Sequence, residues 1–151
     1  MTDTLADQPL PVRAKLVAAW TSFMFFYAYV DILNFYKPGA IAEILEGRVH
    51  EFELSQTFSV TALGILAVPM YMIVASAALP PAANRVTNLV VASLLVPFTI
   101  YNISGGEYLL FYGLGIVLEL VLLALVVRWA WTWPRTTTAP DAAPRAAGAL
   151  R

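Results

Sequence analysis

The sequence predicts an all-α polytopic membrane protein: a bundle of four transmembrane helices with a short interfacial helix in the first outer loop. The 151-residue chain is 60% hydrophobic and only 13% charged, which is far more apolar than a soluble domain of this size. Four apolar segments of about 20 residues or more follow one another, and a helix of that length crosses a hydrocarbon core of about 30 Å. Proline, glycine or polar residues separate the segments, so each is expected to form one membrane-spanning helix.

A tail, a helix and a polar loop begin the chain. Residues 1–13 lack apolar periodicity and are expected to form a disordered N-terminal tail. The first helix is predicted over residues 15–36, because Pro38 follows it and proline disfavours helical geometry in the residue before it. The polar loop 40–54 has apolar residues at helical spacing, which predicts a short interfacial helix ending at Gly47.

Capping residues, prolines and glycines separate the other three helices. Ser55 is a suitable N-cap for the second helix, which Pro80 and Pro81 bring to an end. The predicted bounds of these helices are 56–79, 84–103 and 108–133. They complete a membrane domain over residues 14–133. Beyond it, residues 134–151 are rich in Ala, Thr, Pro and Arg, a composition that predicts a disordered C-terminal tail.

The distribution of basic residues predicts the orientation of the helices. Four spans place both termini on one side of the membrane, and seven of the nine Lys and Arg residues fall on that side, leaving Lys37 and Arg48 opposite. Cytoplasmic segments carry the excess of Lys and Arg. We therefore expect a multi-pass protein of the cell (inner or plasma) membrane with both termini in the cytoplasm and the acidic first loop outside.

Polar side chains recur on each predicted helix at alternating spacings of three and four residues, which is the spacing of one helix face. Most of them would lie in the outer half of the membrane, so they predict a pocket that opens outward. Small and polar residues also hold membrane helices together, at about 0.6 to 2 kcal/mol each, and packing is the alternative role for the threonines and glycines. The predicted faces are Trp20, Met24, Tyr27, Asp31 and Asn34; Thr57, Thr61, Gly64, Val68 and Tyr71; Asn88, Ala92, Leu95, Thr99 and Asn102; and Tyr108, Tyr112, Gly115, Glu119 and Leu122. The pocket and proton-exchange candidates among them are Glu119, Asp31, Tyr27, Asn34, Thr61, Thr99, Asn102 and Tyr112.

Two acids distinguish this pattern from simple packing. Glu119 lies near the middle of the last predicted helix, where an ionisable group costs at least about 2.5 kcal/mol on insertion scales. It is expected to face the bundle interior and either to find a partner or to stay protonated, with a structural hydrogen bond as the alternative to a functional role. Asp31 lies nearer the outer end of its helix. It is expected to serve either as a functional group or as a cap at the membrane interface. The two acids differ in depth by about 9 Å, so a relay through Tyr27, Tyr112 or water is expected rather than a shared proton.

Basic and aromatic residues near the cytoplasmic side are expected to anchor the bundle to membrane lipids. Arg85 begins the third helix, where an arginine binds lipid phosphate or the ends of neighbouring helices. Four tryptophans lie toward the same side, where aromatic belts mark the membrane interface. They are Trp20, Trp129, Trp131 and Trp133.

Several classes of chemistry are excluded by what the sequence lacks. The chain contains no cysteine, which excludes disulfides, thiolate metal sites and cysteine nucleophiles. Its one histidine, His50, lies in the polar loop and is expected to be solvated. No metal or cofactor is expected, and no basic patch indicates nucleic-acid binding.

The pattern resembles a family of small bacterial four-helix membrane proteins that is known only as a domain of unknown function and is DoxX-like in general build. The resemblance covers about residues 15–134 and implies no established activity. The residues that carry it are Tyr29, Asp31, Ile32, Gly47, Asn84, Arg85, Asn88, Glu119, Ala130, Trp131 and Trp133.

Three functions remain open at this point, in order of preference. The first is binding or transport of a small amphiphilic or cationic molecule, in which Glu119 exchanges a proton. The second is a structural or accessory subunit, in which the polar faces contact another membrane protein or a second copy. The third is an enzyme acting on a lipid-like substrate with Glu119 and Asp31 as acid and base; nothing in the sequence specifies a bond to be broken, so an enzyme is less favoured.

Overall fold

The computed structural model describes residues 8–49, 52–101 and 108–135. Long helices dominate these residues, and one short helix and a small β-hairpin lie between the first two long helices. The elements are α1 (Val12–Asn34), α2 (Ala40–Leu45), β1 (Arg48–Val49), β2 (Phe52–Glu53), α3 (Gln56–Ala78), α4 (Pro81–Tyr101) and α5 (Leu109–Trp131). The structure confirms the predicted all-α bundle with a short helix in the first loop.

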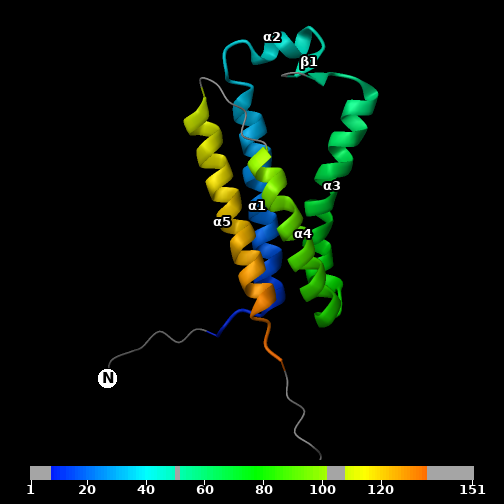
Figure 1. Ribbon diagram of the computed structural model, residues 1–151, viewed down its shortest axis with the longest axis vertical. Helices are drawn as coiled ribbons and strands as arrows, with labels where there is room; N and C mark the ends of the chain where they lie inside the picture. The colour runs from blue at the N-terminus through cyan, green and yellow to red at the C-terminus, as the bar shows by residue number, and fades with distance from the viewer. Residues whose placement is uncertain (1–7, 50–51, 102–107, 136–151) are drawn as a thin grey trace, which may run out of the picture.

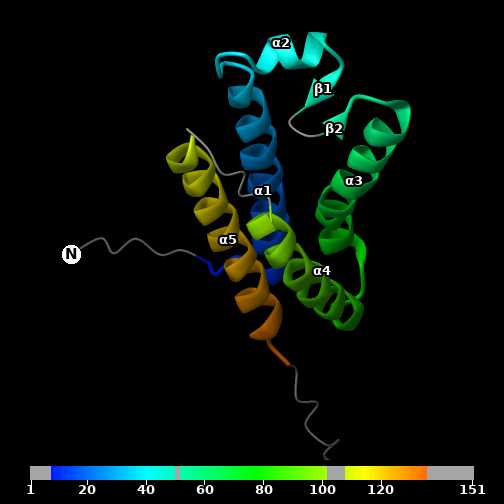
Figure 2. The ribbon, with the colours of Figure 1, turned by 45° about the horizontal axis from the view of Figure 1, so that its top comes forward.

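The four long helices run up and down beside one another (Figure 1). We call the end where α1 begins and α5 finishes the terminal end, and the end that carries α2, β1 and β2 the hairpin end. Helix α1 packs against both α3 and α5, and α4 packs against α5, whereas α3 and α4 contact each other less. The hairpin end is crossed by α2 and the strands, which lie across the axes of the long helices (Figure 2).

Local sequence signals explain most helix boundaries. The Ser55 side chain accepts a hydrogen bond from the backbone N–H of Phe58 at 3.1 Å, which confirms it as the N-cap of α3. Helix α4 begins at Pro81, three residues before the predicted start at residue 84. The reason is that proline, although it ends the preceding helix, is well suited to the first position of a new one, where no backbone N–H is needed. Helix α1 likewise begins earlier than predicted, at Val12.

The first loop contains structure that the sequence pattern did not predict. Helix α2 follows Gly39 and Gly47 follows α2, and both glycines have a positive φ, 90° and 81°, which other residues adopt only at a cost. Gly47 then leads into the antiparallel pair β1–β2, in which Val49 lies opposite Phe52. The predicted interfacial helix is therefore present, followed by a hairpin.

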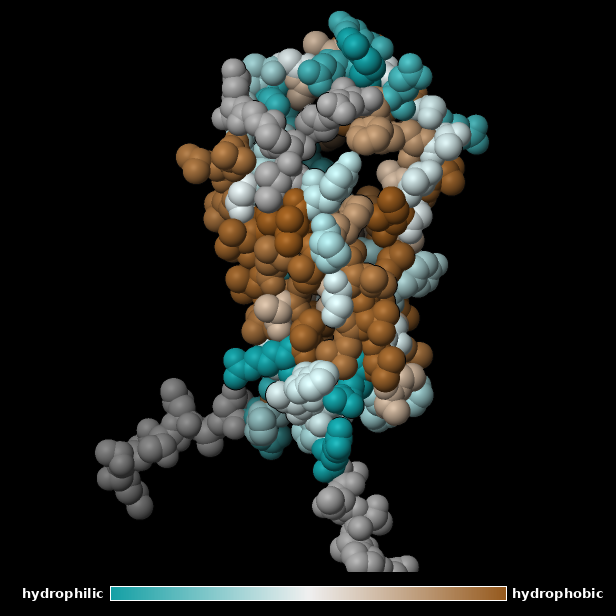
Figure 3. Space-filling model, viewed as in Figure 1, coloured by the Kyte–Doolittle hydropathy of each residue, from teal (hydrophilic) through white to brown (hydrophobic). Residues whose placement is uncertain are grey.

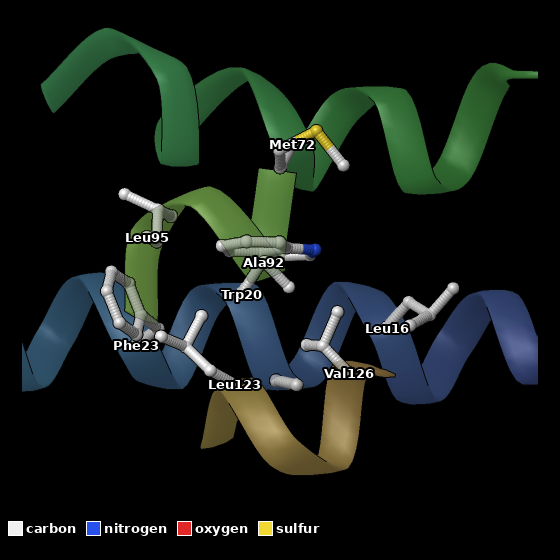
Figure 4. Packing of buried hydrophobic residues seen from close by; sticks show 9 residues of the cluster. Leu16, Trp20, Phe23, Met72, Ala92, Leu95, Leu123 and Val126 are labelled. Atoms are coloured by element: carbon white, nitrogen blue, oxygen red, sulfur yellow. The ribbon is translucent and has the colours of Figure 1, made fainter. Parts of the chain in front are cut away.

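The core lies toward the terminal end and is built from α1, α3, α4 and α5 (Figure 4). On α4 the buried residues include the predicted face from Asn88 to Thr99, which is confirmed; on α5, Gly115 and Glu119 are buried as predicted. The prediction for α3 is wrong, because Val68 and Tyr71 are exposed, and the buried residues of that helix are Pro69, Met72 and Ser76. Helix α3 is apolar on all sides, so its few polar residues did not indicate which face packs. The apolar core comprises Leu16, Ala19, Trp20, Phe23, Met72, Ala92, Leu95, Leu123 and Val126.

Helix α3 leans away from the other long helices toward the hairpin end (Figures 1 and 2). All three of its buried residues lie in its terminal half, and residues 56–68 contribute none. Figure 3 shows the surface hollowed beside this part of the helix. The bundle is therefore tightly packed at the terminal end and open on the α3 side at the hairpin end.

On the face that Figure 3 shows, hydrophobic side chains cover the middle of the bundle between two polar ends. Helices α1, α3, α4 and α5 are each long and apolar enough to cross a membrane. Lipid-facing helices expose apolar side chains because the hydrocarbon around them is equally apolar. The exposed hydrophobic residues on these helices are therefore explained by a surrounding membrane.

Candidate functional site

Glu119 occupies the interior of the bundle near the middle of α5. Its side chain is only 5% exposed, and it faces the Thr99 hydroxyl of α4, with which it interacts. The Thr99 Oγ1 atom is nevertheless buried without a hydrogen bond of ordinary geometry among the described residues. A buried hydroxyl in that position is costly unless it is paired. The Glu119–Thr99 contact is thus a polar site with unused hydrogen-bonding capacity.

Asp31 lies one helix away from Glu119, on α1, and its side chain is exposed. The two carboxyls are close enough to interact electrostatically. All Lys and Arg residues of the chain lie outside the stretches 16–36, 56–84 and 86–127, and among the described residues no ion pair includes either acid. We call Asp31, Thr99 and Glu119 the acid site; it contains two carboxyls and no cationic partner from the described chain.

Close contacts between α1 and α5 border the acid site. The Tyr112 hydroxyl donates a hydrogen bond to Asn34 Oδ1 at 2.5 Å, which links two residues 78 positions apart. One turn deeper, a Cβ placed on Gly115 would lie 3.0 Å from Val30 Cγ2. The glycine therefore allows α1 and α5 to approach closely between the Asn34–Tyr112 bond and Glu119.

The remaining pocket candidates fall into different surroundings. The Tyr27 ring packs against that of Phe23, with centroids 6.5 Å apart, on the same helix as Asp31. Thr61 is exposed on the hairpin half of α3. Asn102 and His50 lie outside the described residues. The structure thus brings Glu119, Thr99 and Asp31 together and places Thr61 apart from them.

A second polar cluster, near the terminal end, was not recognised as a unit from the sequence. Asn88 Oδ1 accepts hydrogen bonds from Trp20 Nε1 at 2.7 Å and from Ser76 Oγ at 3.3 Å. Asn88 Nδ2 donates to Asn84 Oδ1 at 2.7 Å, and Asn84 Nδ2 donates to the backbone oxygen of Ser76 at 2.6 Å. All four residues, which we call the amide cluster, are 0% exposed. The sequence signal for this cluster was the pair Asn84 and Asn88, four residues apart on one face of an apolar helix. Buried amides need hydrogen-bond partners, so such a pair indicates a polar contact between helices.

The amide cluster and the acid site differ in how completely they are satisfied. Each side-chain amide nitrogen and oxygen of Asn84 and Asn88 has a hydrogen-bond partner within the protein, so no amide atom of the cluster is left unpaired. The cluster joins α1, α3 and α4, which is a structural role. The acid site, with an unpaired hydroxyl and two carboxyls, is the candidate functional site.

Arg85 contacts the end of a neighbouring helix, which is one of the two roles expected of it. Arg85 Nε donates to the backbone oxygen of Ala130 at 3.1 Å, and its guanidinium lies 5.7 Å from the centroid of the Trp131 ring. Carbonyls at a helix C-terminus have no partner within the helix, so Arg85 caps α5. Trp131 is exposed, whereas Trp129 and Trp133 pack partly against the core.

Trp20 was expected at the membrane interface but is completely buried. The structural reason is its hydrogen bond to Asn88, which requires the indole N–H to point into the bundle.

Within residues 8–49, 52–101 and 108–135, no group of three or more His, Cys, Asp or Glu side chains gathers in a way that would hold a metal ion.

Four helices that are long and apolar enough to span a membrane define the class: this is a multi-pass integral membrane protein. Residues 11–140 match the model of a family described as a family of unknown function, DUF6326, and the chain belongs to that family. No curated protein and no solved structure matches the chain. The expected resemblance to an uncharacterised family is therefore confirmed, while a likeness to DoxX proteins and a bacterial source stay predictions.

Proposed function

We propose that this protein binds a small amphiphilic cation at the acid site and exchanges it for a proton on Glu119. The observation that carries the proposal is the charge composition of the site: two interacting carboxyls and no cationic side chain of the described residues paired with either one. A carboxylate within a membrane helix needs a cation or a proton to offset its desolvation. An ammonium or a lipophilic cation in the site would supply that charge.

The shape of the bundle supports a ligand that enters from the hairpin end. Residues 56–68 of α3 contribute nothing to the core, whereas the amide cluster holds the terminal half of the same helix against α4. A ligand would therefore reach the acid site through the opening beside the hairpin half of α3. The packed terminal half of the bundle would prevent it from passing further. The apolar surroundings favour an amphiphile, since its apolar part would replace lipid beside α3.

The proposed exchange follows from the surroundings of each acid. Glu119 is buried and would hold a proton in the absence of ligand, since nothing in the described chain neutralises its carboxylate. Asp31 is exposed and would make the first contact with an arriving cation. Binding of the cation beside Glu119 would release the proton. Thr99 Oγ1 could then donate a hydrogen bond to the ionised carboxylate.

The test is binding of tetraphenylphosphonium to the purified protein in detergent, measured by calorimetry in two buffers of different ionisation enthalpy. Glu119→Gln keeps the size of the neutral acid but cannot ionise, so we expect its affinity to fall at least about tenfold, which corresponds to 1.4 kcal/mol. Proton release on binding should disappear in the same variant. Asp31→Asn should weaken binding less and leave proton release intact.

Glu53→Gln is the matched control, because it makes the same chemical change on the exposed strand β2. It should bind like the parent. If Glu119→Gln also binds like the parent and remains as stable, Glu119 is a structural group and the proposal fails. The accessory-subunit interpretation would then replace it.

We further propose that both termini lie in the cytoplasm. Arg13, Lys15, Arg85, Arg128 and Arg135 gather at the terminal end of the bundle, as the positive-inside rule requires of a cytoplasmic face. A reporter active only in the cytoplasm, fused to the C-terminus, should work. A reporter active only outside the cytoplasm should not, and the opposite result would reverse the orientation.

A further inference from the structure

A cavity lies at the hairpin end, outside the acid site, between the end of α1 and the start of α5. Its volume is about 240 Å³, larger than a cavity of about 150 Å³ that admits benzene. It therefore has room for one aromatic ring with a polar substituent. The residues that shape it include Asn34, Tyr36, Lys37, Tyr108, Phe111 and Tyr112.

Aromatic rings form the apolar walls of this cavity. Phe111 and Tyr112 meet edge to face with centroids 5.2 Å apart, and Tyr108 lies beneath the Lys37 ammonium, 5.3 Å from Nζ to the ring centroid. The Tyr112 hydroxyl is already committed to Asn34. The rings therefore offer flat apolar surface, on which a planar ligand can stack.

The charge in this cavity is opposite to that of the acid site. Lys37 is the one charged residue among the described residues that line it, and within that part of the chain its ammonium takes part in no ion pair. The Asn34 side chain accepts from Tyr112 through Oδ1, which leaves its amide N–H groups as further donors. The Lys37 ammonium and the Asn34 amide nitrogen are donors, and together they suit a carboxylate or another anionic oxygen group.

The geometry points to a binding site for a small anionic amphiphile, whose ring or short chain lies against Tyr108, Phe111 and Tyr112 while its anionic group meets Lys37. Lys37 follows the last residue of α1, Asn34, and Tyr108 precedes the first residue of α5, Leu109. These positions are level with the ends of the membrane spans, where the head groups of amphiphiles lie. The anionic group would be that of a free organic acid or of an anionic lipid.

The experiment uses 4-fluorobenzoate, followed by fluorine NMR, with the full-length protein in nanodiscs of zwitterionic lipid. Benzoate fits one ring and one carboxylate into the cavity, and 4-fluorobenzamide is its neutral counterpart. We expect benzoate to bind more tightly than the amide. Lys37→Gln should weaken benzoate binding at least tenfold and leave amide binding unchanged, whereas Lys37→Arg, which keeps the charge, should bind benzoate like the parent.

Lys15→Gln is the matched control, since it removes one lysine at the terminal end, far from the cavity. Glu119→Gln should also bind benzoate normally, which separates this site from the proposed cation site. The inference is overturned if Lys37→Gln binds benzoate as the parent does, or if the amide binds as tightly as benzoate. Repeating the titration with anionic lipid in the nanodisc distinguishes the two sources: competition identifies a lipid head group, and undiminished binding identifies a free acid.

Discussion

Replacing Asn88 by alanine is expected to destabilise the bundle by roughly 2–4 kcal/mol, because the change removes hydrogen bonds to two neighbouring helices and to Asn84 of the same helix. The Asn88 carbonyl accepts from Trp20 on α1 and from Ser76 on α3, and its amide donates to Asn84. A single interhelical bond within a membrane contributes on average about 0.6 kcal/mol and at most about 1.7. The larger total arises because Trp20 Nε1 and Asn84 Oδ1 would remain buried and unpaired.

Thermal unfolding in detergent, followed by circular dichroism, measures the loss. Ser93→Ala is the control on the same helix, since Ser93 is exposed, and its unfolding midpoint should stay near that of the parent. A double-mutant cycle with Trp20→Phe isolates the central bond, because phenylalanine keeps most of the ring but lacks the donor. Additive losses in that cycle would show that the Trp20–Asn88 bond contributes nothing to stability.

The membrane spans could be predicted from the sequence because length and hydropathy determine them locally. Each of the four apolar segments forms a helix, and Ser55 caps α3 as its hydroxyl and position suggest. The start of α4 at Pro81 was missed because the same residue that ends one helix can begin the next. The short β1–β2 pair was missed because its strands are only two residues long.

The packed faces were predictable only where polar residues mark them. Helix α4 carries Asn88 and Thr99 on its buried face, and α5 carries Glu119 on its own. Helix α3 has no such marker near its middle, and its hydrophobic residues pack equally well against protein or lipid. Its true inner face, with Pro69 and Met72, depends on tertiary contacts that composition does not encode.

The candidate site, like the packed faces, was predictable in its polar residues and not in the contacts between helices. Burial of Glu119 was predictable from the cost of placing an acid against lipid, and its facing residue Thr99 lies on the predicted stripe of α4. The pairing of Tyr112 with Asn34 links positions 78 residues apart and depends on the register of two helices. That register depends on the close approach of α1 and α5 at Gly115, which spacing placed on the buried face without identifying Val30 as its neighbour.

Gly115→Leu is therefore expected to disrupt the α1–α5 interface at the acid site. Even the first added carbon would lie 3.0 Å from Val30 Cγ2, and valine has little freedom to rotate away because its χ1 is restricted in a helix. Overpacking of this kind costs about 1–3 kcal/mol. The helices would have to separate, which would break the Tyr112–Asn34 bond one turn away and move Asp31 from Glu119.

The measurements are thermal unfolding and tetraphenylphosphonium binding, and both should be impaired by Gly115→Leu. Gly113→Leu is the matched control two residues away, because nothing lies within 4 Å of a Cβ built at Gly113. It should keep both properties close to those of the parent. Gly115→Ala should give a milder loss, and combining it with Val30→Ala should restore stability, because that second change removes the methyl group that the new Cβ meets. If Gly115→Ala is no less stable than Gly113→Ala, or if Val30→Ala does not rescue it, close approach at Gly115 does not hold α1 and α5 in register.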